Sequence, residues 1–499
     1  MTNSKFEFSA RDYDFVEYVQ AQNWIGGEWT PSASGNSEEV LNPRHGEVMG
    51  SVVFSNKSDL QSAFEAAKNA QPGWAERPIR ERAEVLYKLK SLMEENLDEL
   101  SWLLSHENGK TFPEAKAEVL KGIECVEMGA SLQNMADGGQ LDVSRGVNCR
   151  VIHEPIGVVA GVTPFNFPTM VPLWMIPQAL VAGNSFIMKP SERTPYGAMK
   201  LAELLQEAGL PDGVFNIVNG GKEAVEAITD HEGIKAVAFV GSTPVAKIVY
   251  ERGSKTGKKM VCLGGAKNHL VVVPDADLEL TSSNVIASFT GCAGQRCMAA
   301  AVLLAVGDTQ HIIDAVAEGS AQIEPGTGIG PIITDESYER IMGFIDQAEA
   351  DGADVIVDGR GAKVEGTGGR WIGPTILDNV KPGHPCATEE IFGPVLTIVR
   401  VDTLEEALEI ENASPYGNAA AIYTTNGGIA ERAINRFEAG MCGVNIGVPV
   451  PREPFAFGGW NDSKFGHGDM TGWDGFTFWT RPRKVTSKWA LQSDQTWMS

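Results

Sequence analysis

Short apolar strands that alternate with helical segments begin near residue 150, and they constrain the fold more than any other feature. The candidate strands are IGVVAGVT, NSFIMKP, VFNIVNG and IKAVAFVGS, and helical patterns cover residues 170–182, 198–208 and 222–229. Alternation of strand and helix is typical of parallel βαβ units. The sequence therefore predicts an α/β fold built on a doubly wound sheet.

A second alternating pattern follows residue 297. AVLLAV, ADVIVDG and PVLTIVRV have the composition of strands, and residues 337–351 and 404–412 have helical periodicity. The stretch VNCRVIHEP and the tail FTFWTRPRKVTSKW alternate like strands but have no partner nearby in the sequence. We expect them to pair in a small accessory sheet, whose exposed edges would favour contact between subunits.

Composition excludes several classes of protein. The net charge of −24 disfavours nucleic acid or anionic lipid as a partner. Seven cysteines, without a C-x-x-C pair, predict neither disulfides nor a metal site and favour a reducing cytoplasm. The N-terminal residues lack the apolar stretch of a signal peptide. Residues 156–188 carry no charge and could span a bilayer, but four prolines favour a buried strand, a loop and a helix instead.

The run FTGCAGQRCMA, residues 289–299, contains the candidate nucleophile Cys297. A cysteine thiol with an ordinary pKa of about 8.5 becomes a good nucleophile where a positive charge or an N–H dipole favours the thiolate. Considered alone, a cysteine that precedes an apolar strand is more often part of the core. The neighbouring motifs decide between these two interpretations.

Five short strings, in the same order, resemble the aldehyde dehydrogenase superfamily. G-Q-x-C at Cys297 resembles its nucleophile segment, and T-P-F-N-F-P at residues 163–168 resembles the loop whose asparagine forms the oxyanion hole. K-P-S-E (189–192), F-V-G-S (239–242) and E-I-F-G-P (390–394) resemble its cofactor segments. Without this context, an asparagine between two prolines would be a turn residue. The resemblance implies an aldehyde dehydrogenase-like fold, catalytic Cys297 and Asn166, and cofactor-binding Thr163, Phe165, Lys189, Glu192, Arg193, Gly241, Ser242, Glu390 and Phe392.

Glu192 bears on which cofactor the resemblance implies. A carboxylate accepts hydrogen bonds from a ribose 2′-hydroxyl and repels a 2′-phosphate. We therefore expect NAD to be preferred over NADP. A role for Glu192 at the start of the following helix is compatible with this expectation.

The acyl acceptor is predicted from a missing carboxylate. Hydrolysing relatives carry a glutamate in E-L-G-G that activates water, and the matching string here begins with Cys262; a second family glutamate is replaced by Trp473. A thioester without a general base should hydrolyse slowly, whereas a thiol acceptor needs less help. G-A-K-N-H (265–269) and GQRCMA resemble the CoA-acylating methylmalonate-semialdehyde dehydrogenase branch. That branch converts malonate or methylmalonate semialdehyde to acetyl-CoA or propionyl-CoA with loss of carbon dioxide, so coenzyme A is the expected co-substrate.

A substrate of this kind brings a carboxylate that needs a cation. Arg296, beside the candidate nucleophile, can offer a bidentate guanidinium. The branch has a second arginine on an early helix, where this chain has Lys121. Lysine is a point charge and not an equivalent replacement. Lys121 could equally belong to a solvated helix face.

We expect an NAD-binding domain from residues 1–135 and 156–267, a catalytic domain from 268–478, and oligomerisation strands at 136–155 and 479–499. The accessory strands would join the chain into a homodimer or homotetramer. Three alternatives remain open at this point. They are a hydrolytic aldehyde dehydrogenase that releases a free acid, a CoA-acylating enzyme for another short aldehyde, and a binding protein without activity.

Overall fold

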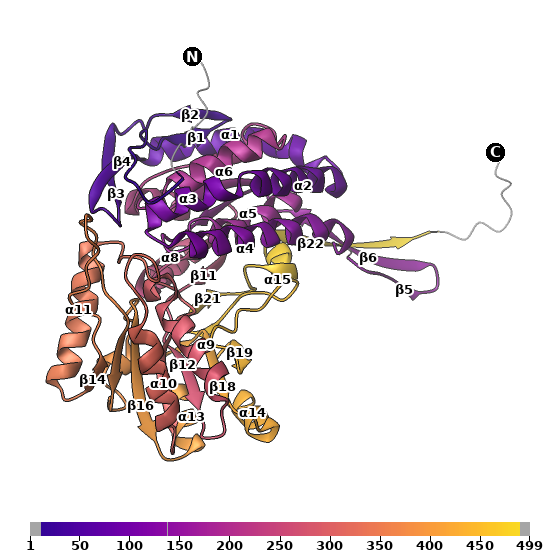
Figure 1. Cartoon of the computed structure of the whole chain (residues 1–499). Coiled ribbons are helices and arrows are strands. Elements are labelled where there is room, and N and C mark those ends of the chain that lie inside the picture. Colours follow the sequence, from indigo (N-terminus) through magenta and orange to yellow (C-terminus); the bar gives the residue numbers. More distant parts are fainter. Residues whose placement is uncertain (1–10, 137, 490–499) are drawn as a thin grey trace, which may run out of the picture.

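The computed structural model describes residues 11–136 and 138–489, and it contains two large, mainly parallel sheets (Figure 1). The first sheet has eight strands in the order β2-β1-β9-β8-β7-β10-β11-β21. Its strands are β1 (Asn23–Ile25), β2 (Glu28–Thr30), β7 (Val158–Val162), β8 (Ser185–Lys189), β9 (Phe215–Ile217), β10 (Ala236–Val240), β11 (Lys259–Leu263) and β21 (Lys464–Gly466).

The strand order of the first sheet confirms the predicted doubly wound topology. After the antiparallel edge strands β1 and β2, the chain starts the parallel part at β7 in the centre, adds β8 and β9 on one side, and then returns to add β10 and β11 on the other. Every residue of β7, β8 and β10 is buried, as expected for parallel strands covered on both faces. The winding direction therefore reverses between β7 and β10, where open α/β sheets bind ligands.

Helices cover both faces of this sheet. Apolar side chains of α5 (Met170–Val181) and α6 (Tyr196–Glu207) share one core cluster, which also receives α2 (Ile79–Glu95) and α4 (Phe112–Ser131). The opposite face packs against α1 (Lys57–Ala75), α7 (Lys222–Asp230) and α8 (Thr243–Lys255). The remaining helix of this layer is α3 (Leu97–Asn108), and a separate hairpin comprises β3 (Asn36–Asn42) and β4 (Glu47–Phe54).

The second sheet has seven strands in the order β14-β15-β16-β13-β12-β18-β19, all parallel except β14. One face packs against α9 and α10, and the other against α11, α13 and α14. Its strands are β12 (Asn268–Val272), β13 (Ala300–Val306), β14 (Asp354–Val357), β15 (Thr375–Asp378), β16 (Val395–Val401), β18 (Ala419–Tyr423) and β19 (Met441–Val444). Its helices are α9 (Leu278–Thr290), α10 (Gln310–Ala321), α11 (Asp335–Ala350), α12 (Pro385–Thr388), α13 (Leu404–Asn412) and α14 (Gly427–Ile434).

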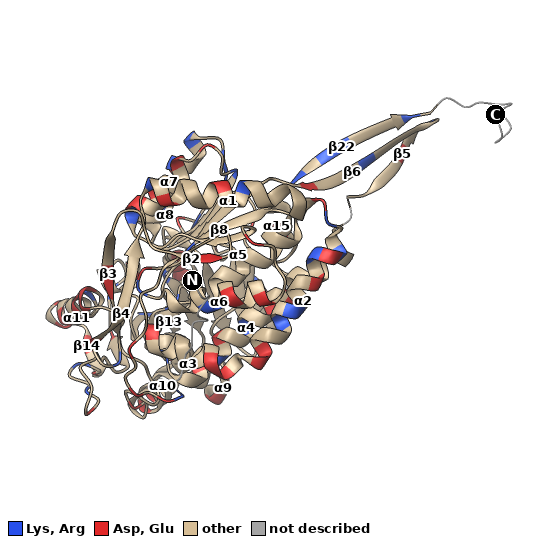
Figure 2. Ribbon diagram, turned by 90° about the horizontal axis from the view of Figure 1, so that it is seen from above, with Lys and Arg blue, Asp and Glu red and all other residues tan. Residues whose placement is uncertain are grey.

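A three-stranded arm extends away from the body in both views (Figures 1 and 2). It comprises β5 (Gln140–Ser144), β6 (Val147–Pro155) and β22 (Thr480–Lys488), with β6 in the middle. β22 pairs antiparallel with β6 over nine residues, so the accessory sheet expected from the sequence is confirmed. Whether this arm joins subunits stays a prediction, as do the domain boundaries, and residues 490–499 of the predicted strand segment lie outside the described residues.

The predicted strand in the C-terminal tail is wrong in its first part. Residues up to Phe478 belong to a helix, α15 (Gly472–Phe478), and the strand begins only at Thr480. Phe476, Phe478 and Trp479 are all buried in the core cluster that contains α5. Their aromatic spacing therefore reflects packing into that core and not the alternation of a strand.

The uncharged segment 156–188 folds as its prolines predicted. It supplies the buried strand β7, a loop, the buried helix α5 and the buried strand β8. Among the described residues, no helix combines the length and the apolar composition that a membrane crossing requires. The elements not yet named are the short helical turns Leu132–Asn134 and Gly291–Gly294 and the two-residue strands β17 (Tyr416–Gly417) and β20 (Trp460–Asn461).

Candidate active site

The candidate site lies where the edges of the two sheets meet. In the first sheet, Thr163 and Gly241 follow the carboxyl ends of β7 and β10, at the point where the winding reverses. In the second sheet, Cys297 and Glu390 precede the amino ends of β13 and β16. The geometry of parallel strands therefore brings segments that are far apart in the sequence to one place.

A cavity of 320 Å³ occupies this junction. Its wall includes side chains from four of the five recognised strings, together with Ser337 and Arg340 of α11. Of the predicted site residues, the structure brings together Phe165, Asn166, Gly241, Ser242, Cys297, Glu390 and Phe392. The other predicted residues lie outside this wall.

The backbone at Cys297 is held by two buried asparagines. The Nδ2 atoms of Asn268 and Asn418 donate to the carbonyl oxygen of Cys297 at 2.8 and 3.0 Å. Asn268 also donates to Ala299 O at 3.0 Å and accepts from the Ala419 N–H at 3.1 Å, so it ties together the starts of three strands. Neither asparagine was among the site residues predicted from the sequence. The sequence signal that could have identified them is an asparagine where an apolar strand begins: Asn268 is the first residue of β12, and Asn418 directly precedes β18.

The environment of Cys297 opposes ionisation of the free thiol. Burial raises its pKa to about 12, and the nearby Glu390 carboxylate acts in the same direction. The backbone N–H groups of Cys297 and Met298 and the Arg296 guanidinium act in the opposite direction but do not prevail. The effect of the Arg296 guanidinium on the pKa of Cys297 is thus smaller than the effect of burial.

Asn166 is joined to the nucleophile segment. Its Nδ2 donates to the carbonyl oxygen of Gln295 at 3.1 Å. Gln295 is fixed in turn, since its side chain accepts from Ile333 N at 3.1 Å and donates to Pro331 O at 3.2 Å. The side-chain amide of Asn166 therefore faces the segment that carries Cys297, as an oxyanion donor would have to.

A buried ion pair supports the loop that carries Asn166. Lys110 Nζ lies 2.5 Å from Glu118 Oε2, and the two side chains are 2% and 1% exposed. Lys110 also donates to Asn166 O at 2.6 Å, and the second oxygen of Glu118 accepts from the N–H groups of Thr169 and Met170. The pair thus satisfies the Asn166 carbonyl and the N–H groups of Thr169 and Met170, at the centre and the end of the loop. Neither Lys110 nor Glu118 was predicted from the sequence to belong to the site.

Glu390 is the only carboxylate among the described residues that line the cavity. Its Oε1 accepts from Ala266 N at 3.0 Å, and Arg340 donates to the carbonyl oxygens of Glu390 and Ile391 at 2.8 and 2.7 Å. Burial raises the pKa of Glu390, although the Ala266 N–H, Arg340 and Lys267 all favour its ionised form. A Cβ atom at position 265 would overlap the Glu390 carboxylate. Glycine at this position therefore lets that carboxylate lie against the backbone.

The K-P-S-E segment lies beside the cavity and not in its wall. Lys189 is buried and lies 2.8 Å from Glu192 Oε2, while Arg193 is exposed. Burial alone would raise the pKa of Glu192, but the ammonium group of Lys189 lowers it below its ordinary value. Glu192 is therefore an anion. Thr163, also predicted, is buried, and its hydroxyl has no hydrogen-bond partner among the described residues.

The two predicted substrate cations both have protein partners. Arg296 Nη2 donates to the carbonyl oxygens of Ala287 and Ser288 at the end of α9, at 2.6 and 2.7 Å. Lys121 forms ion pairs with Glu124 at 2.9 Å and Glu453 at 2.6 Å. Neither side chain lines the cavity. Their substrate roles stay predictions.

Cys262, which stands where hydrolysing relatives have a glutamate, is fully buried. It packs in the apolar cluster that contains Phe239 and Met260, and that burial raises its pKa far above the ordinary range. Trp473 packs against His153 and against the core cluster that contains α5. Neither residue is part of the cavity wall, so neither side chain supplies a base there.

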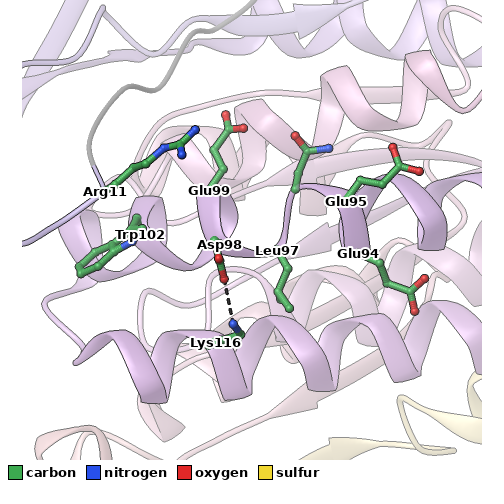
Figure 3. Close-up of a pocket in the computed structure, with 9 residues that line it drawn as sticks. Arg11, Glu94, Glu95, Leu97, Asp98, Glu99, Trp102 and Lys116 are labelled. Atoms are coloured by element: carbon green, nitrogen blue, oxygen red, sulfur yellow. Dashed lines mark hydrogen bonds and ion pairs between the residues drawn. The ribbon is translucent and has the colours of Figure 1, made fainter.

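A second hollow, of 800 Å³, lies where α2 meets α3 and has a different character (Figure 3). Asp98 pairs with Lys116 of α4 at 2.9 Å across it. It shares no residue with the cavity at Cys297 and contains no thiol; its wall comprises Arg11, Glu94, Glu95, Asn96, Leu97, Asp98, Glu99, Trp102 and Lys116. The chemistry predicted from the motifs therefore belongs to the first cavity.

Comparison with known proteins agrees with this arrangement. Residues 29–485 match the sequence profile of the aldehyde dehydrogenase family. The chain belongs to the aldehyde dehydrogenase family. The resemblance found in the five short strings is thereby confirmed, and the doubly wound fold is the fold of its solved relatives.

Several members of the family are similar over almost their full length. A malonate-semialdehyde dehydrogenase from Geobacillus kaustophilus is 44% identical over 476 residues, which cover 94% of this chain and 98% of the relative. A methylmalonate-semialdehyde dehydrogenase structure from Oceanimonas doudoroffii has a TM-score of 0.93 at 40% identity and covers 95% and 99% of the two chains. A structure from Sinorhizobium meliloti, described as an enzyme of the same kind complexed with NAD, gives 0.94 at 40% identity and covers 96% and 100%.

The first prediction concerns the ionisation of Cys297. Because its pKa lies near 12, the rate of alkylation by iodoacetamide in the free protein should rise about tenfold for each pH unit between pH 7 and 9. Peptide mass spectrometry at each pH measures the rate for Cys297 alone, with Cys149 of the arm as a reference for the reagent. A rate that levels off below pH 8 would show that the thiolate is already formed.

The second prediction concerns the ion pair beneath the Asn166 loop. Lys110→Ala leaves Glu118 buried without its cation, which should cost about 3–5 kcal/mol of stability. The exposed pair of Lys90 and Glu94 is the matched control, and Lys90→Ala should cost only about 0.3–0.5 kcal/mol. Thermal unfolding followed by intrinsic fluorescence compares the two variants. Equal midpoints would mean that the buried pair does not stabilise the loop.

Proposed function

We propose that this chain is an NAD-dependent, CoA-acylating malonate- or methylmalonate-semialdehyde dehydrogenase. For malonate semialdehyde, the reaction converts the aldehyde, NAD and coenzyme A into acetyl-CoA, carbon dioxide and NADH. The observation that carries the proposal is the composition of the cavity wall, which combines a cysteine with a single carboxylate among its described residues. The relatives and their names support the same substrates.

Cys297 supplies the nucleophile in this proposal. Its thiol gives up a proton to water, the resulting thiolate adds to the aldehyde carbon, and the Asn166 amide stabilises the oxyanion by donating a hydrogen bond. NAD, when bound, accepts the hydride. An acyl thioester that still carries the substrate carboxylate then remains on Cys297. Its carboxylate leaves as carbon dioxide, a proton takes its place on the carbon next to the thioester carbonyl, and the thiolate of coenzyme A displaces the cysteine sulfur as a thiolate.

The fate of that thioester depends on which residue could activate water. Glu390 is the one candidate in the described wall, and the Ala266 N–H and the proposed contact with the cofactor both engage its carboxylate. A thioester without a free general base hydrolyses slowly. Transfer to a thiol is therefore the favoured outcome.

Several features of the cavity fit NAD. Ser242 is the N-cap residue of α8, and its side chain makes no capping hydrogen bond. Backbone N–H groups in the first turn of α8 are therefore available to the phosphates of NAD. Thr163 follows the end of β7, across the reversal point of the sheet from Ser242, which follows β10. Its hydroxyl has no hydrogen-bond partner in the described part of the chain. Glu390 is proposed to hold the nicotinamide ribose, and the pair of Lys189 and Glu192 the adenosine ribose.

Arg296 is the proposed anchor for the substrate carboxylate. Only its Nη2 atom is tied to helix carbonyls, and its buried Nε has no partner among the described residues. Lys121 is a weaker candidate because Glu453 already neutralises it at 2.6 Å. A substrate carboxylate would have to displace Glu453 to reach it.

We further propose a homo-oligomer that works in the cytoplasm. The edge strands of the arm, β5 and β22, leave backbone groups available for a second subunit. Leu141 and Val143 on β5 are exposed and apolar, which suits burial in such a contact. All seven cysteines are free thiols, as expected in a reducing compartment.

The third prediction tests the acyl acceptor. With aldehyde and NAD but no coenzyme A, NADH should form in one rapid burst per active site and then slowly, because the thioester on Cys297 has no efficient acceptor. Addition of coenzyme A should restore fast turnover, since a thiolate attacks a thioester without a base. Stopped-flow absorbance at the NADH band and product analysis measure both phases.

The outcome that contradicts this proposal is steady, fast oxidation without any thiol, with the free acid as product. It would identify a hydrolytic enzyme in which Glu390 or another group activates water. Slow turnover of both semialdehydes, alongside fast turnover of an uncharged aldehyde, would instead point to a different short substrate.

The fourth prediction tests the role of Glu192 in cofactor choice. Wild-type kcat/KM should favour NAD over NADP by at least about tenfold, because the anion repels a 2′-phosphate. Glu192→Gln removes that charge and should reduce the preference. Glu223→Gln, at an exposed position on α7, is the control and should leave the preference as it is. Equal use of both cofactors by the wild-type enzyme would exclude this role.

A further inference from the structure

The turn that precedes Cys297 has an unusual backbone conformation. Cys292 and Ala293 have φ angles of 54° and 52°, and Gly294 follows with 66°. Three successive residues are therefore left-handed, and only one of them is a glycine. A Cβ atom makes this conformation unfavourable, so surrounding contacts must hold the first two residues in place.

Glu114 makes one of those contacts from a different element. Its Oε1 accepts from the backbone N–H of Cys292 at 2.6 Å. Its Oε2 accepts from the N–H and the hydroxyl of Thr111, at 3.1 and 2.9 Å, which completes the capping box at the start of α4. One carboxylate thus fixes both the helix end and the first left-handed residue.

The turn in its left-handed form determines where the next residues lie. Gln295 N donates to Cys292 O at 3.0 Å and closes the turn, and Gln295 O receives the amide of Asn166. Gly294 packs so tightly on the E-I-F-G-P segment that a Cβ atom there would overlap the carbonyl group of Gly393. A turn that relaxed to right-handed angles would break both contacts and displace Cys297.

We propose that Glu114 is a positioning residue for the nucleophile. It holds Cys292 in the left-handed conformation and so keeps Cys297 opposite Asn166 in the cavity. This inference rests on the proposed function, because it takes Cys297 as the nucleophile. The competing interpretation is that Glu114 only caps α4 and affects stability alone.

The chain provides a matched control for the capping interpretation. Glu406 completes the same kind of capping box at the start of α13, where its Oε2 accepts from the N–H groups of Asp402 and Thr403. It makes no contact with the nucleophile segment. Glu114→Ala and Glu406→Ala therefore remove equivalent caps, and only the first releases Cys292.

The fifth prediction compares these two variants by three readouts: thermal midpoint, NADH burst rate, and alkylation rate of Cys297 by iodoacetamide. Glu114→Ala should slow the burst by about 10–100-fold, the scale of a misplaced reacting group. Glu406→Ala, which removes a cap alone, should lower the thermal midpoint and leave the burst rate and the alkylation rate of Cys297 unchanged.

A second substitution tests the mechanism directly. Glycine adopts positive φ without the penalty of a Cβ atom, so Cys292→Gly should make Glu114 less necessary. The double variant Glu114→Ala/Cys292→Gly should therefore recover much of the burst rate that Glu114→Ala loses. The double variant also tests the proposal if Glu114→Ala alone fails to fold. Removal of the backbone strain at position 292 should then restore both folding and the NADH burst.

Two results would overturn the proposal. One is a burst rate in Glu114→Ala that matches the rate in Glu406→Ala, and the other is no recovery when Cys292→Gly is added. Failure of the proposed function is distinguishable from both, because alkylation of Cys297 needs neither coenzyme A nor aldehyde. A hydrolytic enzyme would still show the difference between the two glutamate variants in the alkylation rate.

Discussion

The active-site architecture depends on one constraint: parallel strands place all their carboxyl ends at one edge of a sheet and all their amino ends at the other. The carboxyl edge of the first sheet and the amino edge of the second meet at one cavity, which is lined by residues that follow β7 and β10 and by residues that precede β13 and β16. The first edge contributes loops and a helix N-terminus, which suit an anionic ligand. The second contributes the segments that begin strands β12, β13, β16 and β18, and with them the thiol at Cys297. Neither sheet contains the whole site, so the chemistry requires both.

Loops at such a junction have no strand neighbours to satisfy their backbone groups, and buried side chains perform that task here. The amides of Asn268 and Asn418, the pair of Lys110 and Glu118, and the carboxylate of Glu114 each hydrogen-bond a loop backbone. Such groups stabilise a structure only when every partner is present, because a buried polar atom left without its partner costs more than the bond contributes. The loops of the cavity are therefore ordered by polar contacts, while the sheets behind them are ordered by apolar packing.

The sequence predicted most of the structure that depends on local pattern. Apolar strands such as β7 and β8, the helix α5 between them and the arm strand β6 lie where their composition indicated, and four of the five strings contribute to the cavity wall. Contacts that depend on tertiary distance could not be predicted in this way. Glu114 meets Cys292 across 178 residues, and no local pattern marks that contact. The raised pKa of Cys297 could not be predicted for the same reason, since its neighbour Arg296 is visible in the sequence but the burial that raises the pKa is not.

The last strands of the chain complete elements that begin far earlier. β21, at residues 464–466, closes the edge of the first sheet beside β11, and β22 pairs with β6 across more than 320 residues. During ribosomal synthesis, about 200 residues separate the emergence of β11 from that of its final partner. An unpaired strand edge is a template for association with other chains. The nascent N-terminal half thus presents two incomplete sheets until translation is nearly finished, and release of the C-terminal segment becomes the event that commits the polypeptide to its native pairing.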